Sequence, residues 1–169
     1  MFRSKDDNFN CVKDFHAKMD EKTQEVVQPY SAEEAGHRAE FKIEELVEFL
    51  YSTAGNEAEF KELIVGLHQA LDRAVDKVAQ KGLSKDPLVD QVDALVDLLY
   101  LTYGTFVLMG VDPAPLFDIV HQSNMGKIFP DGKAHFDPRT HKILKPDNWE
   151  ADYAPEPALK REMARQLER

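Results

Sequence analysis

The sequence is poor in cysteine, glycine and basic side chains, and each shortage excludes a class of protein. Cys11 is the only cysteine among 169 residues, so no disulfide can form within the chain, and a reducing, cytoplasmic setting is expected. The eight glycines form no phosphate-binding loop. Because 21 basic residues face 31 acidic ones, the net charge is -10, which argues against binding a nucleic-acid polymer but permits a small polyanion carried with its metal.

Long apolar runs are also scarce. Residues 1–10 lack the apolar core of a signal peptide, and no stretch reads as the roughly 20 apolar residues of a membrane span, so no membrane partner is expected. The length fits one domain, covering 1–169, that can bury a sizeable core.

Helix start and stop signals divide the first three quarters of the chain. Ser31-Ala-Glu-Glu34 has the form of a capping box, Gly55-Asn56 interrupts the pattern, and Asp86 followed by a proline starts it again. Apolar residues at helical spacing fill the intervals. The expected helices cover residues 8–19, 31–52, 57–80, 86–109 and 113–124.

Beyond Asn124 the helical pattern fails. Turn signals at Asp131-Gly132 and Asp137-Pro138 predict a short hairpin over 133–144, with Ile143 and Leu144 packed inward, before a short charged helix that ends the chain. We therefore expect an all-α fold, a helical bundle of four to five helices with a small irregular or hairpin C-terminal appendage, in which residues 125–155 form a basic lid.

Two acidic motifs inside apolar helical segments are the most informative feature of the sequence. They are Glu44-Glu45-Leu-Val-Glu48 and Asp93-Ala-Leu-Val-Asp97. Residues three or four apart share one face of a helix, so the carboxylates of each motif repel one another. Apolar flanks of this kind are typical of helices buried in a bundle or at a subunit interface, where a bound cation would relieve the repulsion.

Carboxylate ligands without cysteine or histidine favour a hard divalent ion, so we expect Mg2+, with Mn2+ as a substitute. The expected metal ligands are Glu45, Glu48, Asp93 and Asp97. Two solvated acidic faces on an acidic protein are the alternative interpretation, and it stays open at this point.

A basic segment follows the acidic motifs. Residues 121–145 carry five basic and two acidic side chains, a local charge of +3 that contrasts with the acidic whole. Such a segment could bind phosphate oxygens as a lid or wall. The candidate substrate-binding residues are Arg38, Asn124, Lys127, Lys142 and Lys145, with the rings of Tyr100, Tyr103 and Trp149 available to stack on a base.

This order of motifs resembles that of the all-α nucleoside triphosphate pyrophosphohydrolases, which include MazG proteins, dimeric dUTPases and phosphoribosyl-ATP pyrophosphohydrolase. The resemblance covers roughly 38–149 and rests on both acidic motifs, on Tyr100 with Thr102-Tyr103-Gly104, and on Asn124-Met-Gly-Lys127 with Lys142-Ile-Leu-Lys145. It implies a nucleotide diphosphatase that uses Mg2+ to cleave between the α and β phosphates, giving a monophosphate and pyrophosphate.

Two features depart from the family pattern. The second family motif is Glu-x-x-Asp, but Ala94 stands three residues before Asp97, so either Asp93 replaces the missing carboxylate or Asp90-x-x-Asp93 is the motif. The interval between the two motifs is also long enough for a whole helix.

The resulting mechanistic hypothesis gives Glu44 the role of general base, while Lys127 and Lys145 stabilise the leaving pyrophosphate and Asn124 orients an oxygen. The apolar breadth of residues 86–109 predicts a homo-oligomer, either a dimer or a dimer of dimers.

Two other functions stay open. One is a non-catalytic helical bundle that binds nucleotides. The other is a ferritin-like di-iron protein, which needs Glu-x-x-His on two helices. Glu34-x-x-His37 provides that motif once, and Asp118-x-x-His121 is only a partial second copy.

Overall fold

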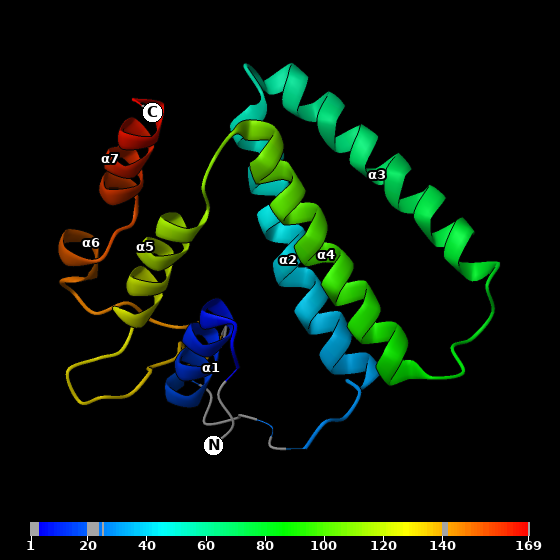
Figure 1. Cartoon of the computed structure of the whole chain (residues 1–169), viewed down its shortest axis with the longest axis horizontal. Helices are drawn as coiled ribbons and strands as arrows, with labels where there is room; N and C mark the ends of the chain where they lie inside the picture. Colours follow the sequence, from blue (N-terminus) through cyan, green and yellow to red (C-terminus); the bar gives the residue numbers. More distant parts are fainter. Residues whose placement is uncertain (1–3, 20–23, 25, 140–141, 169) are drawn as a thin grey trace. The chain divides into compact units, whose positions relative to one another are not determined.

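The computed structural model describes residues 4–19, 24, 26–139 and 142–168 (Figure 1). Within these ranges it contains helices, one isolated antiparallel bridge between Phe136 and Ile143, and no strand, so the all-α class is confirmed. The helices are α1 (Asp7–Met19), α2 (Ala32–Thr53), α3 (Glu57–Ala79), α4 (Pro87–Met109), α5 (Ala114–Met125), α6 (Trp149–Asp152) and α7 (Glu156–Leu167).

The five expected helices are all present, and each end lies within one residue of its expected position. Local side-chain contacts explain this agreement. The Ser31 hydroxyl accepts a hydrogen bond from the Glu34 N–H at 3.2 Å while the Glu34 carboxylate accepts from the Ser31 N–H at 3.1 Å, which is the predicted capping box. The Asn56 side chain accepts from the Glu59 N–H and caps α3 in the same way.

The chain divides into two compact units, each of which is described by itself. Unit 1 comprises residues 1–27 and 98–169, and unit 2 comprises residues 28–97. The boundary falls inside α4, which is one continuous helix. The expectation of a single domain over the whole chain stays a prediction.

Unit 2 has an open interior. Its helices α2 and α3 leave the turn at Gly55–Asn56 and diverge (Figure 1), and an open groove of about 540 Å³ runs between them, lined mainly by Leu46, Leu50, Leu63 and Leu67. No residue from 28 to 97 is buried, and many large apolar side chains of these helices are exposed. One copy of this unit therefore lacks a core.

Unit 1 contains the few buried residues of the described chain. Its helix α5 contacts both α1 and α7. Met19, Pro146 and Trp149 are buried apolar residues. The buried Asn10 side-chain amide accepts a hydrogen bond from the Ser4 N–H at 3.0 Å and donates one to the Ser4 carbonyl at 2.8 Å. The one-turn helix α6, which begins at Trp149, was not predicted from the sequence.

The predicted hairpin is present in reduced form. The Leu144 N–H donates to the His135 carbonyl at 2.8 Å and the Asp137 N–H donates to the Lys142 carbonyl at 2.9 Å, on either side of the isolated bridge. Ile143 is half-buried as expected, but the expectation that Leu144 packs inward is wrong, because neighbouring residues on an extended segment point to opposite sides and Leu144 is exposed.

Helix α4 corrects a further expectation. Its 23 residues are long and apolar enough to cross a membrane, by length and composition alone. The same properties belong to a helix that is covered on all sides by protein. Asp93 and Asp97 lie near its middle, where each charge would cost about 2.5–3.5 kcal/mol at the centre of a bilayer. Protein is therefore the better cover for α4.

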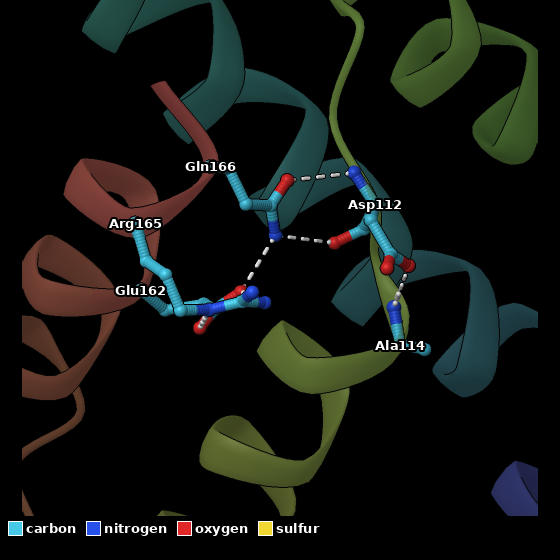
Figure 2. Close-up of polar contacts among 5 residues, drawn as sticks. All are labelled: Asp112, Ala114, Glu162, Arg165 and Gln166. Carbon is cyan, nitrogen blue, oxygen red and sulfur yellow. Dashed lines mark hydrogen bonds and ion pairs between the residues drawn. The ribbon is translucent and has the colours of Figure 1, made fainter. Parts of the chain in front are cut away.

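A glutamine at the end of α7 holds the start of α5 within unit 1 (Figure 2). The side-chain carbonyl of Gln166 accepts a hydrogen bond from the Asp112 N–H at 2.8 Å. The side-chain amide of Gln166 donates to the Asp112 backbone carbonyl at 3.0 Å and to the Glu162 carboxylate at 2.9 Å. Asp112 in turn accepts from the Ala114 N–H at 3.1 Å through its carboxylate. The α4–α5 connection is thus fixed by a side chain more than fifty residues away.

Gln166→Ala is expected to lower the free energy of unfolding by about 1–2 kcal/mol, because two hydrogen bonds to the Asp112 backbone are lost. Urea denaturation followed by circular dichroism measures this change. Leu167→Ala is the matched control, since Leu167 is 84% exposed on the next position. Equal midpoints for the two variants would show that the Gln166 contacts contribute nothing.

Candidate functional site

The acidic residues of α2 lie on the surface of the single chain. Glu44, Glu45 and Glu48 are all exposed, and the helix is unbroken around them. Their spacing of three and four residues brings the three carboxylates to one side of α2, as predicted.

The acidic residues of α4 follow the same pattern. Asp93 and Asp97 are exposed and lie one helical turn apart. Asp90 has a local partner, because its carboxylate accepts a hydrogen bond from the Ser84 hydroxyl in the turn before the helix. This contact favours Asp93 with Asp97, rather than Asp90 with Asp93, as the second pair of the motif.

Both acidic sets are exposed in the single chain. In the described ranges, no group of three or more His, Cys, Asp or Glu side chains is arranged to hold a metal. The expectation that both motifs hold one ion between them stays a prediction.

The chemistry of the donors nevertheless fits Mg2+. All of the candidate ligands are carboxylates, and hard divalent cations prefer oxygen ligands of this kind. Glu45, Glu48, Asp93 and Asp97 keep the helical spacing that two adjoining helices would need to hold a common ion. The metal assignment stays a prediction that requires the two motifs to come together.

Within unit 1, the C-terminal end of α5 carries a polar pair. The Lys127 ammonium donates to the Asn124 side-chain carbonyl at 2.8 Å, and both residues are half-buried. The helix ends at Met125, with Gly126 as its C-cap. Two of the predicted phosphate-binding residues are thus brought into contact by the end of one helix.

Lys145 is connected to the C-terminal end of α5 by Trp149, which contacts both. Its ammonium nitrogen lies 3.5 Å from the centroid of the Trp149 ring, and the Trp149 indole N–H donates to the Ser123 carbonyl at 2.9 Å. Trp149 is only 6% exposed, which leaves little of its ring accessible to a base. Its burial therefore does not support the expected role as a stacking partner. Its contact with Lys145 was not predicted from the sequence, although the two residues lie four positions apart.

The other predicted substrate contacts lie apart from this pair. Lys142 is exposed in the hairpin, where its backbone carbonyl accepts from Asp137. Arg38 is exposed on α2, with its guanidinium carbon 5.3 Å from the centre of the Phe41 ring. Tyr100 is 77% exposed on α4, which leaves its ring accessible.

The tight turn before the hairpin contains a carboxylate–imidazole contact. The Asp131 carboxylate lies 2.8 Å from the His135 ring nitrogen and accepts from the Lys133 N–H at 3.0 Å, while the His135 ring stacks on Phe129 at 4.1 Å. The hydrogen bond from His135 and then that from Lys133 lower the pKa of Asp131 below its ordinary value of 3.8.

A carboxyl group whose folded pKa is lowered stabilises the fold above its unfolded pKa, and that stabilisation is lost as the pH falls through the folded pKa. We therefore expect the turn to loosen below pH 3.8. Carboxyl titration by NMR should place the Asp131 midpoint below this value, and His135→Ala should move the midpoint upward. An unchanged midpoint in His135→Ala would contradict the role of His135.

The di-iron interpretation loses its main support. The Glu34 carboxylate is engaged at the start of α2, where it accepts from the Ser31 N–H at 3.1 Å and from the Ser31 hydroxyl at 2.8 Å. His37 is exposed and its ring contacts Phe41. The complete Glu-x-x-His motif is therefore explained by helix capping.

Comparison with known proteins gives the family. The family model for phosphoribosyl-ATP pyrophosphohydrolase matches residues 12–124, which is more than half of the chain. A crystal structure of a candidate NTP pyrophosphohydrolase from Exiguobacterium sp. 255-15 is 36% identical, covers 98% of each chain and superposes with a TM-score of 0.89. No curated protein sequence matches the chain significantly.

The family match spans both acidic motifs and ends at Asn124, and the similarity to the solved structure extends over the appendage as well. The sequence-based resemblance is thereby confirmed, and the hydrolysis of a phosphoric anhydride follows from it. The chain belongs to the phosphoribosyl-ATP pyrophosphohydrolase family, within the all-α NTP pyrophosphohydrolases.

Proposed function

We propose that the protein is a Mg2+-dependent nucleoside triphosphate pyrophosphohydrolase that cleaves the α–β phosphate bond and releases a monophosphate and pyrophosphate. The observation that carries this proposal is that five carboxylates keep their helical spacing on α2 and α4 within a chain of this family. They are Glu44, Glu45, Glu48, Asp93 and Asp97.

Each group has a distinct role in the proposed reaction. Glu45, Glu48, Asp93 and Asp97 would hold Mg2+, which when bound neutralises phosphate charge and lowers the pKa of water. Glu44 accepts the proton of the attacking water as general base. The water oxygen forms a bond to phosphorus while the bridging anhydride bond breaks, and the leaving group departs as pyrophosphate.

The basic side chains compensate charge on the substrate. Lys127 and Lys145 bind oxygens of the leaving pyrophosphate, where negative charge accumulates, and Asn124 orients an oxygen next to Lys127. Arg38 and Lys142 are further phosphate contacts, and the exposed ring of Tyr100 is available to the base. The cytoplasmic setting stays an expectation from the cysteine content.

We also propose that the active form is an assembly of copies of this chain, a dimer or a dimer of dimers. Thirteen large apolar side chains on the helices of unit 2 are exposed in the single chain. They are Phe41, Ile43, Leu46, Phe49 and Tyr51 on α2, Val65, Leu71, Val75 and Val78 on α3, and Val89, Val92, Leu95 and Val96 on α4.

The magnitudes favour association. Burying the exposed half of such side chains gains about 0.8–1.5 kcal/mol each, and thus roughly 10–20 kcal/mol for the thirteen on each chain. Two copies together gain twice that, which exceeds the roughly 4–15 kcal/mol that association costs in lost freedom of motion. A second copy offers the same apolar faces in return, as an interface with two-fold symmetry requires.

The assembly would also explain the acidic motifs. The carboxylates lie among the apolar residues that a second copy would cover, so they would be removed from water together with those residues. Such a burial is tolerated when a divalent cation neutralises the carboxylates. The missing core and the incomplete metal site thus have one common solution.

A panel of nucleoside triphosphates tests the proposed function. The purified protein is incubated with each triphosphate and Mg2+, and released pyrophosphate and orthophosphate are measured separately. We expect pyrophosphate and monophosphate in equal amounts, and none in EDTA. Orthophosphate release would indicate a different bond specificity, and binding without turnover would favour the non-catalytic bundle.

A further inference from the structure

We propose that Trp149 is a positioning residue that holds Lys145 and the C-terminal end of α5 together as one pyrophosphate-binding cluster. The proposal rests on the proposed function only in taking the phosphate chain as the ligand. The cluster consists of Asn124, Lys127, Lys145 and Trp149, all of which belong to unit 1.

Trp149 contacts the two parts of the cluster with different atoms. Its indole N–H donates to the carbonyl of Ser123, the residue directly before Asn124, in a buried hydrogen bond. Its ring face carries the Lys145 ammonium at 3.5 Å from the centroid. The side chain therefore links the helix end that bears Asn124 and Lys127 to the segment that bears Lys145.

The ring itself is held firmly. Trp149 is buried, and its backbone N–H donates to the carbonyl of Pro146, which is buried as well. The Tyr153 N–H donates to the Trp149 carbonyl at 2.8 Å and closes the single turn of α6. A ring fixed in this way gives a flexible lysine one preferred position.

Tyr153, the C-cap residue of α6, packs on the C-terminal end of α5. A Cβ atom added at Gly126 would overlap the Tyr153 ring, so the ring packs directly on the buried C-cap of α5. Gly126 has no positive φ, hence its lack of a side chain is needed for this packing and not for its backbone conformation. Trp149 and Tyr153 together join α6 to the residues that bear the polar pair.

This arrangement suits an anion with two phosphate groups. A lysine loses much rotational freedom when it binds a ligand, and prior placement on a fixed ring reduces that loss. One face of the ammonium contacts the ring, while Lys145 is exposed and can donate to phosphate oxygens on its other side. Lys127 supplies a second cation whose position is set by its bond to Asn124.

The test measures binding of inorganic pyrophosphate in EDTA by calorimetry, so that neither metal nor turnover is needed. Lys145→Gln should weaken binding about five- to twenty-fold, and Trp149→Leu about three- to ten-fold. Trp149→Phe keeps an aromatic face for the ammonium but loses the N–H bond to Ser123, so it should weaken binding by less than Trp149→Leu does. Lys160→Gln on α7 is the matched control for loss of one exposed positive charge.

A double-mutant cycle separates positioning from general stability. If Trp149 acts through Lys145, Trp149→Leu should weaken binding by less than about two-fold when Lys145 is already glutamine. Trp149 is also the only tryptophan of the chain, so pyrophosphate should change its fluorescence in the wild type but not in Lys145→Gln. Circular dichroism and thermal unfolding of every variant monitor the fold.

The outcomes distinguish this proposal from the proposed function. Equal weakening by Trp149→Leu and Trp149→Phe, additive effects in the cycle, or no pyrophosphate binding by the wild type would overturn the positioning role. Pyrophosphate binding with the expected coupling, in a protein that cleaves no triphosphate, would support the cluster while refuting the hydrolase. Triphosphate cleavage with additive effects would do the reverse.

Discussion

Glu48→Gln is expected to lower Mg2+-dependent pyrophosphate release at least about a hundred-fold, because the amide keeps the size of the side chain but removes the negative charge that would bind the ion. The fold should not suffer. Glu44 and Glu48 are like charges one turn apart on an exposed face, so removing one charge should stabilise α2 by about 0.2–0.5 kcal/mol. Initial rates at saturating Mg2+ and thermal unfolding measure the two effects.

Asp76→Asn is the control for this experiment. Asp76 is an exposed carboxylate on α3, outside both acidic motifs. Asp76→Asn should retain full activity, and its thermal unfolding should show that the fold does not depend on this charge. If Glu48→Gln turned over triphosphates at the wild-type rate, the assignment of Glu48 as a metal ligand would be refuted, whatever its effect on stability.

Placing acids on the exposed face of α3 is the second change with a large expected effect. Leu71 and Val75 lie one turn apart on this helix, and both are more than half exposed in the single chain. In the assembly that we propose, Leu71→Glu with Val75→Glu would bury charge at four positions of a dimer. At about 2 kcal/mol or more per position, association should weaken by roughly 10⁵-fold or more.

Sedimentation velocity at micromolar concentration measures the effect as a shift from oligomer to monomer. Activity should fall with the oligomer, because in our proposal the metal site is completed only in the assembly, and the described residues of one chain show no group arranged to hold a metal. Leu83→Glu is the matched control, since Leu83 is 98% exposed in the loop between α3 and α4. It should leave both mass and activity unchanged.

Two results would contradict the proposed assembly. One is a wild-type protein that sediments as a monomer while fully active, which would mean that the exposed apolar faces have no partner of their own kind. The other is a monomer that co-sediments with phosphatidylcholine vesicles, since the length of α4 also permits a lipid partner. In either case the Leu71→Glu, Val75→Glu double variant would sediment with the same mass as the Leu83→Glu control.

The helices other than α6 were determined by the sequence alone, because the signals that start and stop a helix are local. The Ser31–Glu34 box, the Asn56 cap and the prolines after Asp86 and Asp112 act within four residues of the helix ends that they mark. The family could also be recognised, since spacings such as Glu44 to Glu48 and Asp93 to Asp97 are properties of the chain itself.

The tertiary structure decided what the helices face. Apolar residues around both acidic motifs predicted burial, but a sequence does not show whether the same copy or another one provides the cover, and here unit 2 leaves these faces open. The sequence also could not show that the Trp149 ring holds Lys145 while its indole N–H donates to the Ser123 carbonyl. The hydrogen bond to Ser123 joins segments that lie 26 residues apart. Local patterns fix helices through short-range hydrogen bonds, whereas burial and contacts between distant segments depend on packing that only the folded chain creates.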